Sequence, residues 1–282
     1  SAASDVYKRQ IVGNAIMIWG FHMGVAGAAI ATLISRIFCA LVVLIQLRRD
    51  RQPIVVRDYL KIRPDWPMIG RILGIGIPSG VENSMFQLGK LAIQSTVSTL
   101  GTVAIAAQAM TNILENLNGI AGIGVGVGLM TIVGQCMGAN RKDEAVYYIK
   151  KLSVIAEVTI IVSCLLVFIL TRPVTMLGGM EKTSADMCWH MVMWITIVKP
   201  IMWVSAFVPA YGLRAAGDVK FSMISSCAVM WLCRFCLSVL LIRGLGFGPM
   251  GVWIGMFADW TVRAVLFTWR FHSRKWLEHK VI

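Results

Sequence analysis

Long apolar stretches separated by short polar segments run along almost the whole chain. An α-helix needs about 20 mostly apolar residues to cross the hydrocarbon core of a bilayer. Stretches of this kind predict seven complete spans, at residues 24–47, 66–100, 103–136, 145–170, 186–213, 221–242 and 250–271. The shorter apolar run 11–19 predicts the end of one more helix. We therefore expect an all-α fold, a polytopic transmembrane helical bundle with about seven full spans.

Composition and charge agree with a chain whose solvent is the bilayer. Of its 282 residues 57% are hydrophobic and 15% are charged, whereas a soluble domain has roughly 25% charged residues. In a soluble protein, the net charge of +13 would indicate nucleic acid or another acidic partner. Sixteen Lys and Arg residues, however, lie in the segments 48–63, 141–151, 214–220 and 270–280, and the alternate loops hold only Arg172, Lys182 and Arg243.

This alternation follows the positive-inside rule, by which Lys and Arg mark the cytoplasmic loops of a membrane protein. It predicts a multi-pass protein of the inner (plasma) membrane with a cytoplasmic C-terminus. Because insertion topology accounts for the basic residues, we expect no nucleic-acid partner. The sequence contains no H-E-x-x-H, no G-x-S-x-G and no clustered His set, so we expect neither an enzyme nor a metal or organic cofactor.

Two patterns of small residues have a structural interpretation. Cys233 and Cys236 form a single C-x-x-C, which we interpret as two small apolar residues one helical turn apart rather than as a metal or redox pair. A row of glycines lies in the third predicted span, at Gly119, Gly122, Gly124, Gly126 and Gly128. Small residues let membrane helices approach closely, so the row predicts tight helix packing, with bending of this helix as the alternative.

Polar side chains inside the spans are the candidates for function, because they are costly in a membrane. In the span 66–100, one helical face carries Asn83, Gln87, Lys90 and Gln94, with Glu82 beside it. Such a stripe on an apolar helix predicts a water-filled cavity. Glu82 would attract a cation or proton there, or it would pair with Lys90 or an amide to hold helices together.

The next span carries a second polar stripe. Gln108, Asn112 and Glu115 lie on one face, with Asn116 next to them. Two facing stripes would enclose a central cavity, with Glu115 as a second cation-attracting group. Lys199, next to Pro200, would line the same path, reach toward the interface, or pair with a carboxylate. Arg234 and Arg263 are expected to pair with acids or backbone carbonyls, and Asp259 lies one turn before Arg263.

Four runs of the sequence resemble the multidrug and toxic compound extrusion (MATE) family. The runs are 24–32 (GVAGAAIAT), 76–90 (GIPSGVENSMFQLGK), 134–139 (GQCMGA) and 213–218 (LRAAGD). In order, they are similar to the family's sixth helix, the start of its seventh, and the loops after its eighth and tenth helices. The resemblance implies the C-terminal part of a truncated bacterial member, with one complete six-helix lobe of a twelve-helix transporter plus the preceding helix.

The chain divides into five segments. Residues 1–10 are polar and differ in composition from the apolar run after them. They resemble the translation of an adapter used in sequencing libraries, so we expect them to be non-native. Residues 11–47 would end the N-terminal lobe, 48–65 would form a cytoplasmic inter-lobe loop, 66–271 the C-terminal lobe, and 272–282 a cytoplasmic tail. Because the N-terminal lobe would be missing, we expect the fragment to be inactive alone.

The function that the resemblance implies is that of a secondary active transporter, an antiporter. It would export drugs or organic cations, small molecules of cationic or amphiphilic character, in exchange for Na+ or H+ by alternating access. The alternatives are a lipid-linked saccharide flippase of the same superfamily and a non-transporting membrane subunit. One departure concerns an aspartate that some members carry in the tenth helix: its position falls near Trp203, and no acid lies between Asp186 and Asp218.

Overall fold

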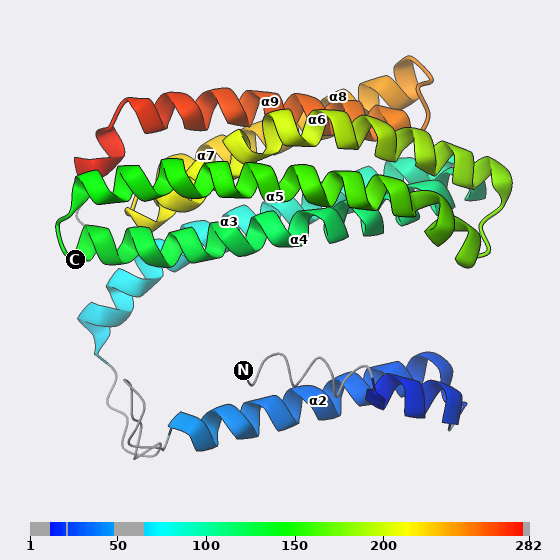
Figure 1. Cartoon of the computed structure of the whole chain (residues 1–282), viewed down its shortest axis with the longest axis horizontal. Coiled ribbons are helices and arrows are strands. Elements are labelled where there is room, and N and C mark those ends of the chain that lie inside the picture. The colour runs from blue at the N-terminus through cyan, green and yellow to red at the C-terminus, as the bar shows by residue number, and fades with distance from the viewer. Residues whose placement is uncertain (1–11, 21, 48–64, 279–282) are drawn as a thin grey trace. The chain divides into compact units, whose positions relative to one another are not determined.

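The computed structural model describes residues 12–20, 22–47 and 65–278 (Figure 1). The adapter-like residues 1–10, nearly all of the predicted inter-lobe loop 48–65 and the end of the predicted tail lie outside the described residues. Every regular element in the described ranges is helical. The predicted all-α fold is therefore confirmed.

The chain forms two compact units, Ser1–Trp66 and Pro67–Ile282. The described part of the first unit contains a short π-helical turn, η1 (Ile16–Gly20), and the apolar helix α2 (Gly24–Leu47). Gly27 of α2 lies where the two meet, because a Cβ atom there would come within 3.0 Å of the carbonyl oxygen of Met17. A larger residue at this position would push η1 away from α2.

The second unit is a bundle of long helices. Its α-helices are α3 (Trp66–Val97, whose first residue belongs to the first unit), α4 (Thr102–Gly138), α5 (Lys142–Leu177), α6 (Lys182–Ala215), α7 (Val219–Val229), α8 (Leu237–Val239) and α9 (Met250–His272). The shorter turns are η2 (Ser98–Leu100), η3 (Met230–Cys236), η4 (Leu240–Gly244) and η5 (Lys275–Glu278). The segments α7, η3, α8 and η4 follow one another without a break and form a single rod, residues 219–244.

Six helices of the described chain are long and apolar enough to cross a membrane. They cover residues 26–45, 102–138, 142–177, 182–215, 219–244 and 250–272. The remaining predicted span is α3, which has 32 residues and is long enough but carries the polar stripe that begins at Asn83. The expected count of about seven spans is consistent with this arrangement. The helices extend past the predicted limits at several ends, as at Lys142–Leu177 for the predicted span 145–170.

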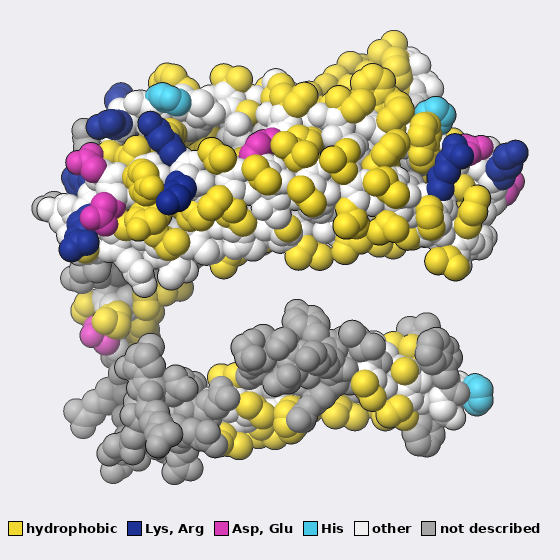
Figure 2. Space-filling model, viewed as in Figure 1, with side chains coloured by type: hydrophobic (Ala, Val, Ile, Leu, Met, Phe, Trp, Pro, Cys, Tyr) yellow, Lys and Arg dark blue, Asp and Glu magenta, His cyan; other side chains and the backbone are white. Residues whose placement is uncertain are grey.

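The core of the second unit lies among α4, α5, α6 and α9, which run side by side in Figure 1. Its largest fully buried side chains include Trp253, Trp260 and Ile160. Figure 2 shows most of the charged side chains of this unit at its two ends, with hydrophobic side chains over the surface between them. A bilayer is the solvent in which such a surface is stable.

The glycine row of α4 divides into two faces. A Cβ atom at Gly122 would lie 2.6 Å from the ring of Trp203, and one at Gly126 would lie 2.5 Å from the ring of Tyr211, both on α6. Gly124 and Gly128 have nothing within 4 Å of such an atom. The prediction of close helix packing is thus confirmed for Gly122 and Gly126, which form a G-x-x-x-G contact.

Helix α3 packs against the bundle mainly through its second half. Ile93 and Val97 are buried there in a small cluster with Met230 and Val252, and Phe86 packs on that cluster. The first half of α3 instead carries exposed apolar side chains, such as those of Met68 and Ile72. Beside this second half of α3, space remains between α3 and α4.

A polar cavity between two helices

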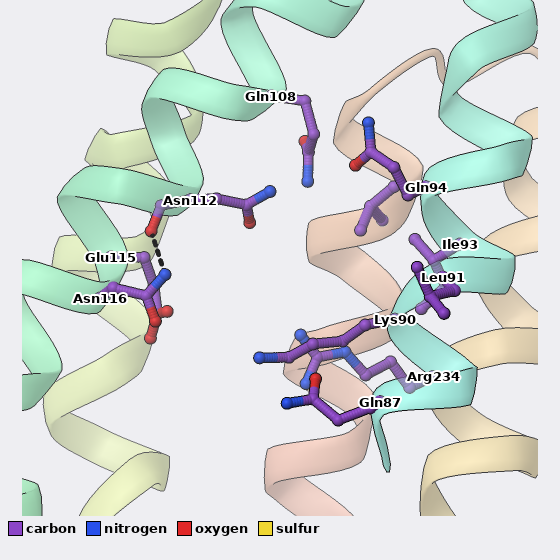
Figure 3. Close-up of a pocket in the computed structure, with 11 residues that line it drawn as sticks. Gln87, Lys90, Leu91, Ile93, Gln94, Gln108, Asn112, Glu115, Asn116 and Arg234 are labelled. Atoms are coloured by element: carbon purple, nitrogen blue, oxygen red, sulfur yellow. Dashed lines mark hydrogen bonds between the residues drawn. The ribbon is translucent and has the colours of Figure 1, made fainter. Parts of the chain in front are cut away.

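A cavity of about 530 Å³ lies between α3 and α4, in the size range of small-molecule binding sites (Figure 3). Seven of the ten predicted site residues line it: Gln87, Lys90, Gln94, Gln108, Asn112, Glu115 and Asn116. The other lining residues are Leu91, Ile93, Arg234 of η3 and Val252 of α9. The two polar stripes therefore face each other, as the helical spacing indicated.

The α3 wall of the cavity carries Gln87, Lys90 and Gln94. They are three and four residues apart, so they share one face of the helix. The ammonium group of Lys90 lies 4.9 Å from the centre of the Phe86 ring. In Figure 3 the side chains of Gln87 and Lys90 lie together at one end of the cavity, and Gln94 lies toward the other end.

The α4 wall is made of hydrogen-bonding side chains that α4 and α9 hold in place. The buried indole Nε1 of Trp253, on α9, donates to Oε1 of Gln108 over 2.9 Å. This bond occupies the carbonyl end of Gln108, and its amide nitrogen points into the cavity in Figure 3. The side chain of Asn116 donates to the backbone carbonyl of Asn112 over 2.8 Å, which leaves the Asn116 carbonyl oxygen available on this wall.

Glu115 does not face the cavity as a free carboxylate. Nζ of Lys199, on α6, lies 2.7 Å from Oε1 of Glu115 and also donates to the Glu115 backbone carbonyl over 3.1 Å. The Lys199 side chain is fully buried, and the Glu115 side chain is 19% exposed. Lys199 therefore pairs with a carboxylate. This was one of its three predicted roles, beside lining the path and reaching toward the interface. A Cβ atom at Gly119 would lie 3.5 Å from Nζ, so this glycine borders the ammonium group.

Arg234 lines the cavity although we predicted for it only pairing with acids or carbonyls. Its Nη1 lies 4.0 Å from Oδ2 of Asp259, but Oδ1 of the same carboxylate already accepts a 2.8 Å hydrogen bond from Arg263. Nη2 of Arg234 lies 2.9 Å from the sulfur of Met256, a weak acceptor. The predicted Asp259–Arg263 pair is thus confirmed. Only the tertiary fold brings Arg234 to the cavity, although its position inside a span was a signal that sequence reasoning could have weighed.

Glu82 and Asn83 lie outside the residues that line the cavity. The carboxylate of Glu82 forms an ion pair and a hydrogen bond with Nη2 of Arg214, at the end of α6, and not with Lys90 or an amide, the partners that we considered as the alternative to cation binding. Asn83 donates to the backbone carbonyl of Ser79, one turn earlier, over 2.9 Å. Arg214 was missed as a partner because it lies 132 residues away in sequence.

A second ion pair connects α9 to the turn that follows α6. Nε of Arg270 donates to Asp218 over 2.6 Å. Arg214 also donates from Nε to the hydroxyl of Ser222 over 2.8 Å. These contacts and the Glu82 pair tie α3, α6, α7 and α9 together near the basic loop that we predict to be cytoplasmic.

In the described ranges 12–20, 22–47 and 65–278, no three His, Cys, Asp or Glu side chains gather as metal ligands. Cys233 and Cys236 are free thiols on η3, one partly buried and one exposed. Trp203, near which the tenth-helix aspartate of some MATE members is expected to fall, packs against Gly122 and under the Lys199 ammonium. The side chains that line the cavity offer a ligand several amides, the cations of Lys90 and Arg234, and the paired carboxylate of Glu115.

Comparisons with known proteins agree with the fold and the membrane setting. The sequence model of the family described as MatE matches residues 78–240, somewhat more than half of the chain. The "Probable multidrug resistance protein NorM" of Thermotoga maritima is 26% identical over 268 residues, which cover 94% of this chain and 56% of that protein. The "FAD transporter" of Shewanella oneidensis is 29% identical over 200 residues, which cover 69% of this chain and 44% of that protein.

A solved structure shares the fold at low sequence identity. It is described as the outward-facing conformation of a multidrug resistance MATE family transporter of the MOP superfamily, and it matches with a TM-score of 0.84 and 18% identity. The match covers 96% of this chain and 61% of that chain. The chain thus spans about half the length of the relatives that it matches.

Proposed function

Because the chain belongs to the MatE family, we propose that it forms the C-terminal lobe of a secondary antiporter that exports small amphiphilic molecules in exchange for Na+ or H+. The observation that carries this proposal is the cavity between α3 and α4, where polar side chains face each other inside a membrane-spanning bundle. A binding site between membrane helices is what a transporter needs, and the cavity holds no arrangement typical of catalysis.

In this proposal the lobe rocks against an N-terminal lobe around a central substrate site, the mechanism by which transporters built from repeated lobes alternate their access. The positions of Lys and Arg support a plasma-membrane location with the C-terminus in the cytoplasm. The chain spans 56% of the Thermotoga relative, so we propose that residues 11–282 do not transport alone.

Glu115 is the residue of the lobe that we assign to the coupling cation. It is the carboxylate among the cavity-lining residues, and it is neutralised by Lys199. Na+ or H+ would have to displace the Lys199 ammonium to bind there, which would link cation entry to a rearrangement of α4 against α6. Glu82 remains a second candidate, and it would have to release Arg214.

The test is drug export by the native reading frame that contains residues 11–282, expressed in an efflux-deficient bacterium. We expect increased drug resistance that Glu115→Gln abolishes. Because Glu115→Gln leaves Lys199 buried without its partner, the double variant Glu115→Gln with Lys199→Met is measured as well. Glu144→Gln, whose side chain is 50% exposed outside the cavity, is the matched control.

Membrane levels of each variant are measured through a C-terminal tag. Resistance that persists in both the single and the double variant would remove the assignment of Glu115. If the unaltered protein reaches normal membrane levels but gives neither drug resistance nor dye export, the proposed transport function is wrong.

The substrate's charge is not fixed by family membership. One relative carries the name of a multidrug resistance protein and another that of an FAD transporter, and FAD contains phosphate groups. The proposed substrate is therefore a small amphiphilic molecule whose charge has to match the side chains of the cavity.

A further inference from the structure

We propose that the cavity between α3 and α4 binds an anionic group of the substrate, a carboxylate or a phosphate, through Lys90 and Arg234. This inference rests on the proposed transport function and specifies its substrate class. It has the opposite sign to the organic cation that the sequence led us to expect. The inference rests on a comparison of the charged side chains at the cavity. The acidic side chain is paired with a cation of the protein, whereas the two basic side chains lack a full partner among the described residues.

The negative charge of the cavity is already neutralised. Glu115 is the acidic side chain among the residues that line it. Lys199 approaches its carboxylate to 2.7 Å from a fully buried position and has no exposure of its own. An organic cation entering the cavity would have to compete with an ammonium group that is covalently attached to α6 and always present.

The positive charge of Lys90 is not neutralised in the same way. Within the described part of the chain, no carboxylate lies within ion-pair distance of its Nζ. Its contact is with the face of the Phe86 ring, which stabilises a cation but does not cancel its charge. Lys90 therefore contributes to the cavity a positive charge that no ion pair of the described residues cancels.

Arg234 contributes a second, incompletely neutralised charge. It shares the single carboxylate of Asp259 with Arg263, and Arg263 makes the shorter contact, 2.8 Å against 4.0 Å. Nε of Arg234 is buried and has no hydrogen-bond partner among the described residues. Two guanidinium groups on one carboxylate leave a surplus of one positive charge next to the cavity.

The two cations are neighbours, because both lie over the same aromatic ring. The centre of the Phe86 ring is 4.9 Å from Nζ of Lys90 and 5.4 Å from Cζ of Arg234. In Figure 3 these two side chains and Gln87 lie together and extend from the α3 side toward α4. Like charges held this close repel each other, and an anion between them would relieve the repulsion.

The donors present at this end suit an oxyanion. An ammonium, a guanidinium and the amide of Gln87 supply several N–H groups, and charged donors form the stronger hydrogen bonds to carboxylate and phosphate oxygens. The apolar side chains of Leu91, Ile93 and Val252 also line the cavity. They would accept the apolar part of the same molecule, so the predicted ligand is an amphiphilic organic anion.

The experiment measures equilibrium binding of two dyes with the same ring system and opposite charge to the purified full-length protein in detergent. Carboxyfluorescein is the anion and rhodamine 123 is the cation. We expect tighter binding of carboxyfluorescein, weakened about tenfold or more by Lys90→Gln and by Arg234→Gln and largely retained in Lys90→Arg. Binding of rhodamine 123 should be unchanged or tighter in Lys90→Gln.

Arg234→Gln disturbs the Asp259 group and can affect folding, so Lys90→Gln and Lys90→Arg decide the outcome. Tighter binding of rhodamine 123 by the unaltered protein, equal carboxyfluorescein binding in the Lys90 variants, or binding of neither dye would overturn the proposal. Displacement of bound carboxyfluorescein by FAD indicates a soluble anion, and displacement only by a detergent-solubilised isoprenyl phosphate indicates a lipid-linked one.

Dye export from cells under a Na+ or H+ gradient separates this inference from the proposed function. Export of rhodamine 123 without any effect of Lys90→Gln would retain the transporter and reject the anion. Anion-selective binding that depends on Lys90, without export of either dye, would retain the anion site and reject the transport function.

Discussion

The buried pair of Lys199 and Glu115 gives the sharpest energetic prediction. Lys199→Met removes the ammonium group but keeps an unbranched side chain of similar length in the same apolar space. The Glu115 carboxylate then loses its 2.7 Å partner. Because the Lys199 side chain is fully buried, water does not replace the ammonium without a rearrangement of α4 against α6.

The size of the effect depends on the burial of the two side chains. Removing one partner of a buried ion pair costs about 3–5 kcal/mol, because the other charge remains without compensation. Glu115 keeps 19% of its side-chain surface exposed toward the cavity, where water can solvate it. We therefore expect Lys199→Met to cost about 3 kcal/mol, the lower end of that range.

The opposite single variant should cost more. Glu115→Gln leaves the unexposed ammonium of Lys199 with neutral acceptors alone, the backbone carbonyl of residue 115, 3.1 Å away, and the side-chain carbonyl of the new Gln. We expect a loss near the upper end, about 5 kcal/mol. The double variant removes both charges, so it should lie within about 1–2 kcal/mol of the unaltered protein.

The assay is thermal unfolding of the purified full-length protein in detergent, followed by loss of the monodisperse peak in size-exclusion chromatography. A loss of about 3 kcal/mol corresponds to roughly 6–12 °C in Tm for a unit of this size. The double variant should recover most of that shift. Single-variant effects that simply add in the double variant, or a Tm that Lys199→Met leaves unchanged, would refute the reasoning.

Two further predictions concern helix packing and the contact at the end of α6. Gly126→Ala should destabilise the protein by about 1–3 kcal/mol, because the added Cβ would lie 2.5 Å from the Tyr211 ring. Gly128→Ala should be neutral or slightly stabilising, because its Cβ meets open space. Thermal unfolding compares the stability of the two variants. Glu82→Gln should cost about 1.5–3 kcal/mol, since it replaces the charged acceptor of Arg214 with a neutral amide between mostly buried side chains, and the same assay measures it.

Each of these predictions has an outcome that contradicts it. Equal Tm values for the two alanine variants would mean that α4 and α6 are not closely packed at Gly126. The control for Glu82 is Glu144→Gln, which removes a 3.4 Å pair with Arg141 between side chains that are 50% and 67% exposed. That exposed pair should contribute less than about 1 kcal/mol, so a Glu82 effect no larger than the Glu144 effect would show that the Arg214 contact does not stabilise the fold.

The sequence by itself determined the features that depend on local spacing. Apolar stretches of bilayer length predicted the helices because a span must satisfy its backbone hydrogen bonds internally. The 3.6-residue period placed Gln87, Lys90 and Gln94 on one face of α3, and Gln108, Asn112 and Glu115 on one face of α4. The opposite-charge spacing of Asp259 and Arg263, four residues apart, was enough to predict their contact.

Only the tertiary structure decided which charges meet. Lys199 and Glu115 are 84 residues apart, and Glu82 and Arg214 are 132 apart. A local pattern carries no information about which of several buried acids a distant cation will reach, because that depends on how the helices rotate and pack. The same holds for Arg234, which η3 brings beside Lys90 and Phe86. The sequence therefore predicted a polar cavity, and the packing of the helices decided the sign of its unbalanced charge.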